Sequence, residues 1–119
     1  MRLIAVLFVF ALVSASSIAQ KPTTQREYYQ LSVYHYNTPS QEQVLEKYLQ
    51  QAFLPALHKK GIKNIGVFKP VANDTAKDKQ IFVLVPFSRL EQVKEISDQL
   101  LKDKEHLTAG KDYIDAVYS

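Results

Sequence analysis

Residues 81–87 form an almost entirely apolar segment, and this segment constrains the fold more than any other part of the chain. Successive residues of a β-strand point to opposite faces of the sheet, so a strand of this composition needs an apolar cover on both faces. A chain of 119 residues holds enough helix to cover only one of them. The sequence therefore predicts a sheet whose second face meets another copy of the domain or a bound apolar molecule.

The composition is that of an ordinary globular domain, with 46% hydrophobic and 23% charged residues. The formal net charge is only +3, and lysines alternate with acidic residues instead of forming blocks, so we expect no nucleic-acid partner. The chain has no cysteine, which excludes disulfides, thiolate catalysis and cysteine-ligated metals. A small domain without disulfides must take its stability from its core or from oligomerisation.

Residues 1–19 have the organisation of a cleavable signal peptide, in which a positive charge precedes an apolar segment at residues 3–13 and small residues follow. We expect cleavage between Ala19 and Gln20, and then a linker over residues 20–26. The protein is accordingly expected to be exported, periplasmic or secreted, with no stable membrane span after cleavage. An uncleaved signal anchor is the alternative, although a span needs about 20 apolar residues.

Hydrophobic periodicity predicts the element order βαββαβ for a domain over residues 27–118. A capping box formed by Ser88 and Glu91 would open the second long helix. The fold class is therefore α+β, with the ferredoxin-like arrangement of an antiparallel sheet and helices on one face. The expected strands cover residues 27–36, 64–71, 80–87 and 113–118, and the expected helices cover residues 40–57, 88–101 and 103–109.

The ends of the first helix are marked by characteristic residues. The N-cap of the helix would be either Thr38, which is followed by a proline, or Ser40, as part of a capping box. Pro55 predicts a kink or a restart, because proline lacks the backbone donor that a helix interior needs. Gly61 predicts a left-handed stop of the Schellman type, with Ile62 packing back on the helix.

Five different short motifs follow one another along residues 27–118, and their order and spacing together resemble those of the NIPSNAP family. They are Tyr29-x-Leu31-x-Val33-Tyr34-His35, Leu54-Pro55-Ala56-Leu57-His58-x-x-Gly61-Ile62, Gly66-Val67-Phe68-Lys69-Pro70, Phe82-Val83-Leu84-Val85-Pro86 and Tyr113-Ile114-x-Ala116-x-Tyr118. The resemblance implies the dimeric α+β barrel version of the ferredoxin-like fold, in which two sheets meet face to face. It implies no particular reaction, because members of the family share no agreed enzymatic activity.

Exported bacterial relatives in this family often look like tandem domains, so two forms remain open. One is a single domain that dimerises with a second copy, which we favour, and the other is a truncated half of a tandem protein. The function we predict is a homodimeric binding or interaction module, with an apolar seam between two sheets or a pocket for a small apolar ligand.

Tyr28, Tyr34 and Tyr36 share one face of the first strand, opposite Leu31 and Val33. If the helices cover Leu31 and Val33, the tyrosines point into the barrel interior or the dimer seam, where they would bury area or line a pocket. The complete set of candidates for the pocket or seam is Tyr28, Tyr34, Tyr36, His58, Phe68, Lys69, Phe82 and Leu84.

Catalysis has weaker support, and we expect neither a metal nor a cofactor. The histidines lack the spacing of metal ligands, so we interpret His35 as a strand-end residue, His58 as a favourable group at a helix C-terminus, and His106 as a surface residue. The alternative function is a monooxygenase, cofactor-independent or haem-linked as in the wider superfamily. His35, Asn37 and Tyr34 would be the first residues to test for it.

Overall fold

The computed structural model describes residues 26–118, so the expected signal peptide, its cleavage point and most of the linker lie outside it. The elements in chain order are β1 (Tyr28–Tyr36), α1 (Pro39–Tyr48), a π-helical segment (Leu49–Phe53), α2 (Leu54–Lys59), β2 (Gly66–Phe68), a 3₁₀ turn (Asn73–Thr75), β3 (Lys79–Phe87), α3 (Glu91–Leu100), α4 (Lys104–Ala109) and α5 (Lys111–Tyr118). The fold class is α+β. Within residues 26–118, no helix combines the length and the apolar character that a membrane span requires.

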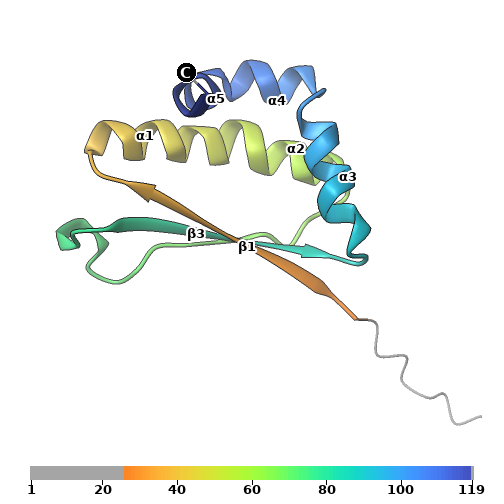
Figure 1. Cartoon of the computed structure of the whole chain (residues 1–119), viewed down its shortest axis with the longest axis horizontal. Coiled ribbons are helices and arrows are strands. Elements are labelled where there is room, and N and C mark those ends of the chain that lie inside the picture. The colour runs from red at the N-terminus through yellow and green to blue at the C-terminus, as the bar shows by residue number, and fades with distance from the viewer. Residues whose placement is uncertain (1–25, 119) are drawn as a thin grey trace, which may run out of the picture.

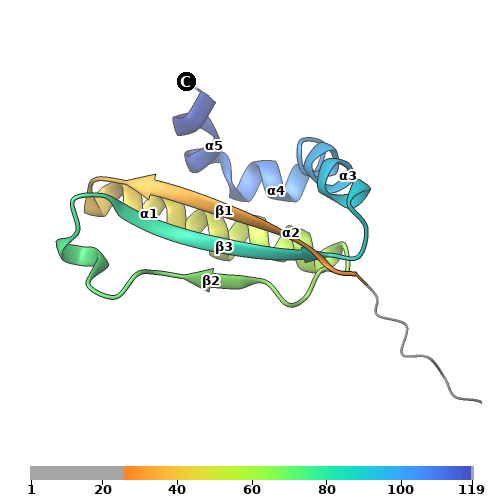
Figure 2. The same ribbon diagram turned by 60° about the horizontal axis from the view of Figure 1, so that its bottom comes forward.

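The sheet has the strand order β1-β3-β2, and both pairs of neighbours are antiparallel. All the helices lie on one side of the sheet (Figure 1), and the opposite side faces the viewer without a covering element in Figure 2. The helix-facing residues of β3 are among the most deeply buried of residues 26–118, with Val83 at 0% and Ile81 and Val85 at 1% exposure. The predicted one-sided cover of the apolar strand is therefore confirmed for the described residues.

The orientation predicted for β1 is wrong, because the helices do not cover Leu31 and Val33. These two side chains are 58% and 41% exposed. The antiparallel register instead places Tyr28, Tyr34 and Tyr36 on the face that carries the buried residues of β3. The large tyrosine rings fill the space beneath the helices, which a row of aliphatic side chains would leave partly empty.

The strand predicted at residues 113–118 is also wrong, since these residues belong to α5. Tyr113, Ile114 and Val117 follow helical spacing as well as they fit a short strand, so the pattern alone was ambiguous. The helix is favoured by the stacking of Tyr113 on Tyr48, whose ring centroids are 4.3 Å apart. An ion pair between Lys111 and Asp115 supports its polar face. Within the described residues, β1 consequently has a neighbour on one side only.

The helical run from α1 to α2 contains a π-helical segment just before Pro55. The Leu54 amide donates to the carbonyl of Leu49, five residues back, instead of four. A proline ring collides with the carbonyl of the residue four positions earlier in an ordinary α-helix. The wider π turn accommodates this ring, so the predicted disturbance at Pro55 takes the form of a bulge in a continuous run.

Both ends of this run follow sequence expectations. Thr38 is the N-cap: its hydroxyl accepts from the Gln41 amide at 3.1 Å, and the Gln41 side chain accepts from the Thr38 amide at 3.3 Å. At the other end, Gly61 has a φ of +87° and Ile62 donates to the carbonyl of Leu57 at 3.0 Å. The predicted Schellman motif is confirmed.

The second long helix begins differently from the prediction. The side chain that hydrogen-bonds to Ser88 belongs to Gln92 and not to Glu91. The side-chain oxygen of Gln92 accepts from the Ser88 amide at 2.9 Å and from the Ser88 hydroxyl at 3.0 Å. The chain makes a turn at Ser88–Leu90 before α3 begins at Glu91, and this turn shifts the partner by one position.

His106 is buried, with 5% exposure, so its interpretation as a surface residue is wrong. Its Nδ1 donates to the carbonyl of Leu100 at 3.0 Å, and its Nε2 accepts from the hydroxyl of Tyr48 at 2.9 Å. Asp103 caps the start of α4 by accepting from the amides of Glu105 and His106. The cap orients this short helix so that His106 faces the helical run beneath it.

Gly110, between α4 and α5, has no room for a side chain. A β-carbon there would lie 2.9 Å from the Tyr48 ring and 2.8 Å from the His106 carbonyl. Gly110→Ala should therefore lower the free energy of unfolding by about 1–3 kcal/mol, the usual cost of overpacking. Urea unfolding measures this, with the exposed Thr108→Ala as the control. Equal stability of Gly110→Ala and the wild type would show that the helices can move apart freely.

Candidate functional site

The most prominent candidate site is the face of the sheet that no described helix covers, here called the open face. It consists of Tyr29, Leu31, Val33, His35, Gly66, Phe68, Gln80, Phe82, Leu84 and Pro86. Cross-strand neighbours at the centre of this face are aliphatic or aromatic, with Leu31 opposite Leu84 and Phe82 between Val33 and Phe68, whereas His35 and Gln80 form a polar pair at one end. No Asp, Glu, Lys or Arg belongs to it. An exposed apolar surface of this kind marks a site of interaction more often than an ordinary solvent face.

Phe68 lies flat on the open face because Gly66 leaves space for its ring. A β-carbon on Gly66 would lie 2.5 and 2.7 Å from two ring carbons of Phe68. The ring covers the glycine backbone and remains 55% exposed on its outer side. The glycine thus allows a large aromatic side chain to lie close to the backbone on the open face.

The predicted seam or pocket residues divide between several places. Phe68, Phe82 and Leu84 lie on the open face. His58 is exposed in the last turn of α2, and Lys69 follows β2 at the side of the sheet. The three tyrosines Tyr28, Tyr34 and Tyr36 lie on the opposite, helix-covered face.

Six residues of the open face were not among the predicted ones: Tyr29 and Leu31, each 58% exposed, and Val33, Gly66, Gln80 and Pro86. Both faces of β1 carry apolar side chains, so a period of two could not tell which face the helices cover. The register with β3 contains that information, since the Val83 side of β3 is wholly buried.

Lys69 is not available as a cation for a ligand. Its ammonium group pairs with Glu42 at 2.7 Å and also with Glu46, both on α1. The hydrogen bonds that Lys69 donates to these carboxylates raise the pKa of Lys69, and the contact with Glu42 lowers the pKa of Glu42. The group therefore ties the chain after β2 to α1.

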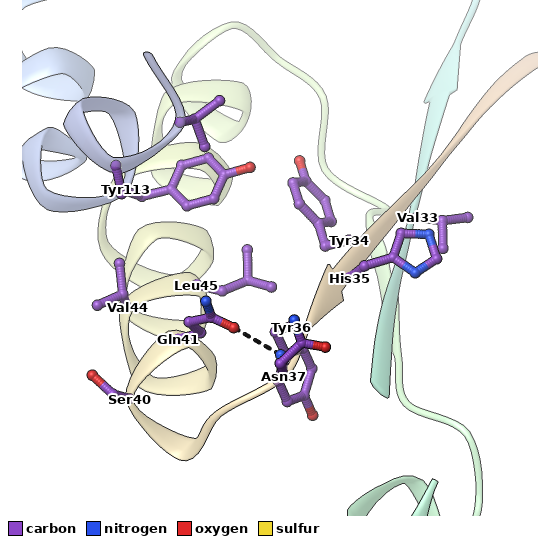
Figure 3. Close-up of a pocket in the computed structure, with 12 residues that line it drawn as sticks. Val33, Tyr34, His35, Tyr36, Asn37, Ser40, Gln41, Val44, Leu45 and Tyr113 are labelled. Carbon is purple, nitrogen blue, oxygen red and sulfur yellow. Dashed lines mark hydrogen bonds between the residues drawn. The ribbon is translucent and has the colours of Figure 1, made fainter. Parts of the chain in front are cut away.

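A second candidate is a cleft of about 440 Å³ between the end of β1, α1 and α5 (Figure 3). Consecutive residues 33–37 line it. Because such residues alternate between the two faces of a strand, the cleft follows the free edge of β1 and not one face. The rings of Tyr34 and Tyr113 meet edge to face there, with centroids 6.1 Å apart.

The cleft brings together Tyr34, His35 and Asn37, the residues predicted for a catalytic role, but their side chains do not converge. In Figure 3 the His35 ring lies on the far side of the strand from Tyr34. Its Nδ1 donates to Asp78 at 2.8 Å, and both side chains are more than half exposed. Asn37 uses its backbone amide to donate to Gln41 at 2.7 Å. Nowhere in residues 26–118 do three potential metal-ligating side chains cluster.

Comparisons with known proteins add no relative: no family model, curated protein or solved structure matches the chain. The resemblance to the NIPSNAP family remains a prediction from the sequence.

Tyr34 provides a test of the helix-covered face of β1 through alkaline pH. Burial raises the pKa of Tyr34 from 10.0 to about 12, with a smaller effect from Tyr113. Above pH 10 the unfolded chain loses this proton before the folded protein does, so stability falls as the pH rises towards 12. Tyr34→Phe should lose less stability than the wild type between about pH 9 and pH 11.5, by on the order of 2 kcal/mol. Urea unfolding at both pH values measures the difference, and a parallel decline of the two proteins would contradict it.

Proposed function

We propose that the protein is an exported homodimeric interaction module in which two copies pack through their open faces. The observation that carries this proposal is the row of apolar side chains on the open face, exposed on β1 and β2 and partly exposed on β3, in a sheet whose helices all lie against its other face. The resemblance to the NIPSNAP family supports the same arrangement, because face-to-face sheets define the dimeric α+β barrel. Cleavage after Ala19 would release this module from its signal peptide.

The exposed apolar area of the open face is large enough to favour contact with a second copy over contact with water. Tyr29 and Phe68, both more than half exposed, offer roughly 200 Å² of aromatic surface. The aliphatic residues between them bring the patch to on the order of 400 Å², a size that is often functional on a monomer. A stable interface takes about 800 Å² from each partner, so the polar rim of the sheet contributes the remainder.

The charge distribution also favours a protein partner with the same surface. The open face carries no charged side chain, and interface cores are depleted of charge in the same way. A self-complementary apolar face buries itself in a two-fold dimer without leaving an unpaired charge. A small apolar ligand would cover only part of a face that extends over three strands.

Light scattering on the purified protein tests this proposal with Phe68→Lys. The lysine would place a charge in the apolar seam while the exposed position tolerates it in the isolated fold, so we expect dissociation to half the assembled mass with unchanged circular dichroism. Val71→Lys is the matched control, because Val71 is 99% exposed and lies off the open face. A Phe68→Lys protein with the wild-type mass would refute packing through the open face. Native mass spectrometry of the same samples would reveal a bound small molecule instead.

A monooxygenase of the dimeric α+β barrel type is the second candidate, favoured by one observation. Asp78 holds the Nδ1 of His35, an arrangement that directs Nε2 outward as an acceptor or ligand next to the cleft. Haem titration followed by absorbance tests it: a Soret band with wild-type protein that His35→Ala abolishes would support haem binding. The same spectrum with both proteins would exclude a role for His35.

A further inference from the structure

The outer edge of β1 is a long strand edge without the usual protection. β1 has nine residues and, among residues 26–118, pairs only with β3, whereas the other edge strand, β2, has three residues. Native edge strands are commonly blunted by charged residues, proline or bulges. The sequence of β1, Tyr28–Tyr36, contains no Lys, Arg, Asp, Glu, Pro or Gly. Its outward backbone groups are therefore an unblocked template for another strand.

This edge is accessible, and part of the helix layer extends past it. The cleft of about 440 Å³ runs along the edge at residues 33–37. In Figure 2, α4 and α5 lie beyond β1, and Figure 1 shows them on the helix side of the sheet. A strand added to β1 would therefore still have helices above one of its faces.

We propose that β1 pairs antiparallel with β1 of a second copy, about a two-fold axis that passes beside Ser32. One register pairs all nine residues, and in it Ser32 meets itself while Leu31 faces the partner's Val33. The remaining pairs join Tyr28 to the partner's Tyr36, Tyr29 to the partner's His35, and Gln30 to the partner's Tyr34. Aromatic and aliphatic pairs of this kind stabilise antiparallel strands, and no like charges oppose each other.

The occupant is a second copy and not an arbitrary peptide because the strand is complementary to itself. Its smallest side chain, Ser32, lies at the midpoint, where the two-fold axis brings identical residues opposite each other. Paired residues share a face, so both copies keep their helices on the same side of a continuous six-stranded sheet. The α5 helices lie near the Tyr36 ends of their own strands, which the antiparallel arrangement places at opposite ends.

This edge pairing is independent of the open-face packing proposed above. The edge axis is perpendicular to the sheet, whereas the face axis lies between two sheets. The two contacts therefore use different surfaces of the same sheet. Loss of one contact leaves a dimer held by the other, so the two proposals can fail separately.

Disulfide trapping tests the edge pairing. The chain has no cysteine, so any disulfide reports the introduced position alone. Directly opposed residues in antiparallel strands have Cα atoms about 4.5–5.5 Å apart, which suits a disulfide. With oxidised glutathione, Ser32→Cys should form a covalent dimer that Gln30→Cys, whose partner in this register is Tyr34, does not form. The Phe68→Lys background removes the open-face contact, and the crosslink should persist there.

Charge complementation gives a second readout that a folding defect cannot imitate. In the Phe68→Lys background, Ser32→Asp and Ser32→Lys should each weaken self-association about tenfold or more, because like charges meet at the axis. An equal mixture of the two should restore the dimer, since opposite charges then meet. Circular dichroism establishes that each variant is folded. Absence of the Ser32→Cys crosslink, or a mixture that stays as monomeric as its components, would overturn the edge pairing while leaving the open-face proposal standing.

Discussion

Burial of one face of β3 beneath the helices is the interaction on which the remaining structure depends. Ile81, Val83 and Val85 are at most 1% exposed, and each fully buried aliphatic side chain contributes about 1.5–3 kcal/mol. Successive residues of a strand point to opposite faces of the sheet, so the burial of Val83 beneath the helices places Phe82 and Leu84 on the open face. The register with β3 then decides which side chains of β1 and β2 lie on each face of the sheet. The open face is thus a direct consequence of how the core is filled.

An aromatic cluster around Tyr48 connects the C-terminal helices to this core. Its ring stacks on Phe53 and Tyr113, and its hydroxyl meets the buried His106. The same contacts favour a helix for the last segment, because Tyr113 stacks on Tyr48 and meets Tyr34 edge to face instead of pairing with β1 as a strand residue. Because this segment is a helix, no described strand pairs with the outer edge of β1, and the cleft lies between that edge and α5.

Charged contacts hold the periphery together and leave the open face uncharged. The Asp103 carboxylate forms ion pairs with the ammonium groups of Lys60 at 2.9 Å and Lys59 at 3.0 Å. These contacts hold the pKa of Asp103 well below its usual range. Lys69 makes its ion pairs with α1. Two carboxylates border the open face, since Glu27 accepts a hydrogen bond from Tyr29 and Asp78 accepts one from His35. We propose self-association and not catalysis because the open face is apolar and the candidate catalytic side chains diverge.

The sequence by itself predicted the α+β class, the three strands of the sheet, the two long helical segments, Thr38 as one of two possible N-caps, the stop at Gly61, and helices on only one face of β3. These features rest on local rules: capping chemistry, proline and glycine geometry, and hydrophobic period. It also pointed to Phe68, Phe82 and Leu84 of the open face.

Only the tertiary structure decided which face of β1 is covered, whether residues 111–118 form a helix, and that His106 is buried. Each of these depends on partners distant in the chain. Local patterns fit both outcomes equally well, and packing against Val83 or Tyr48 selects between them.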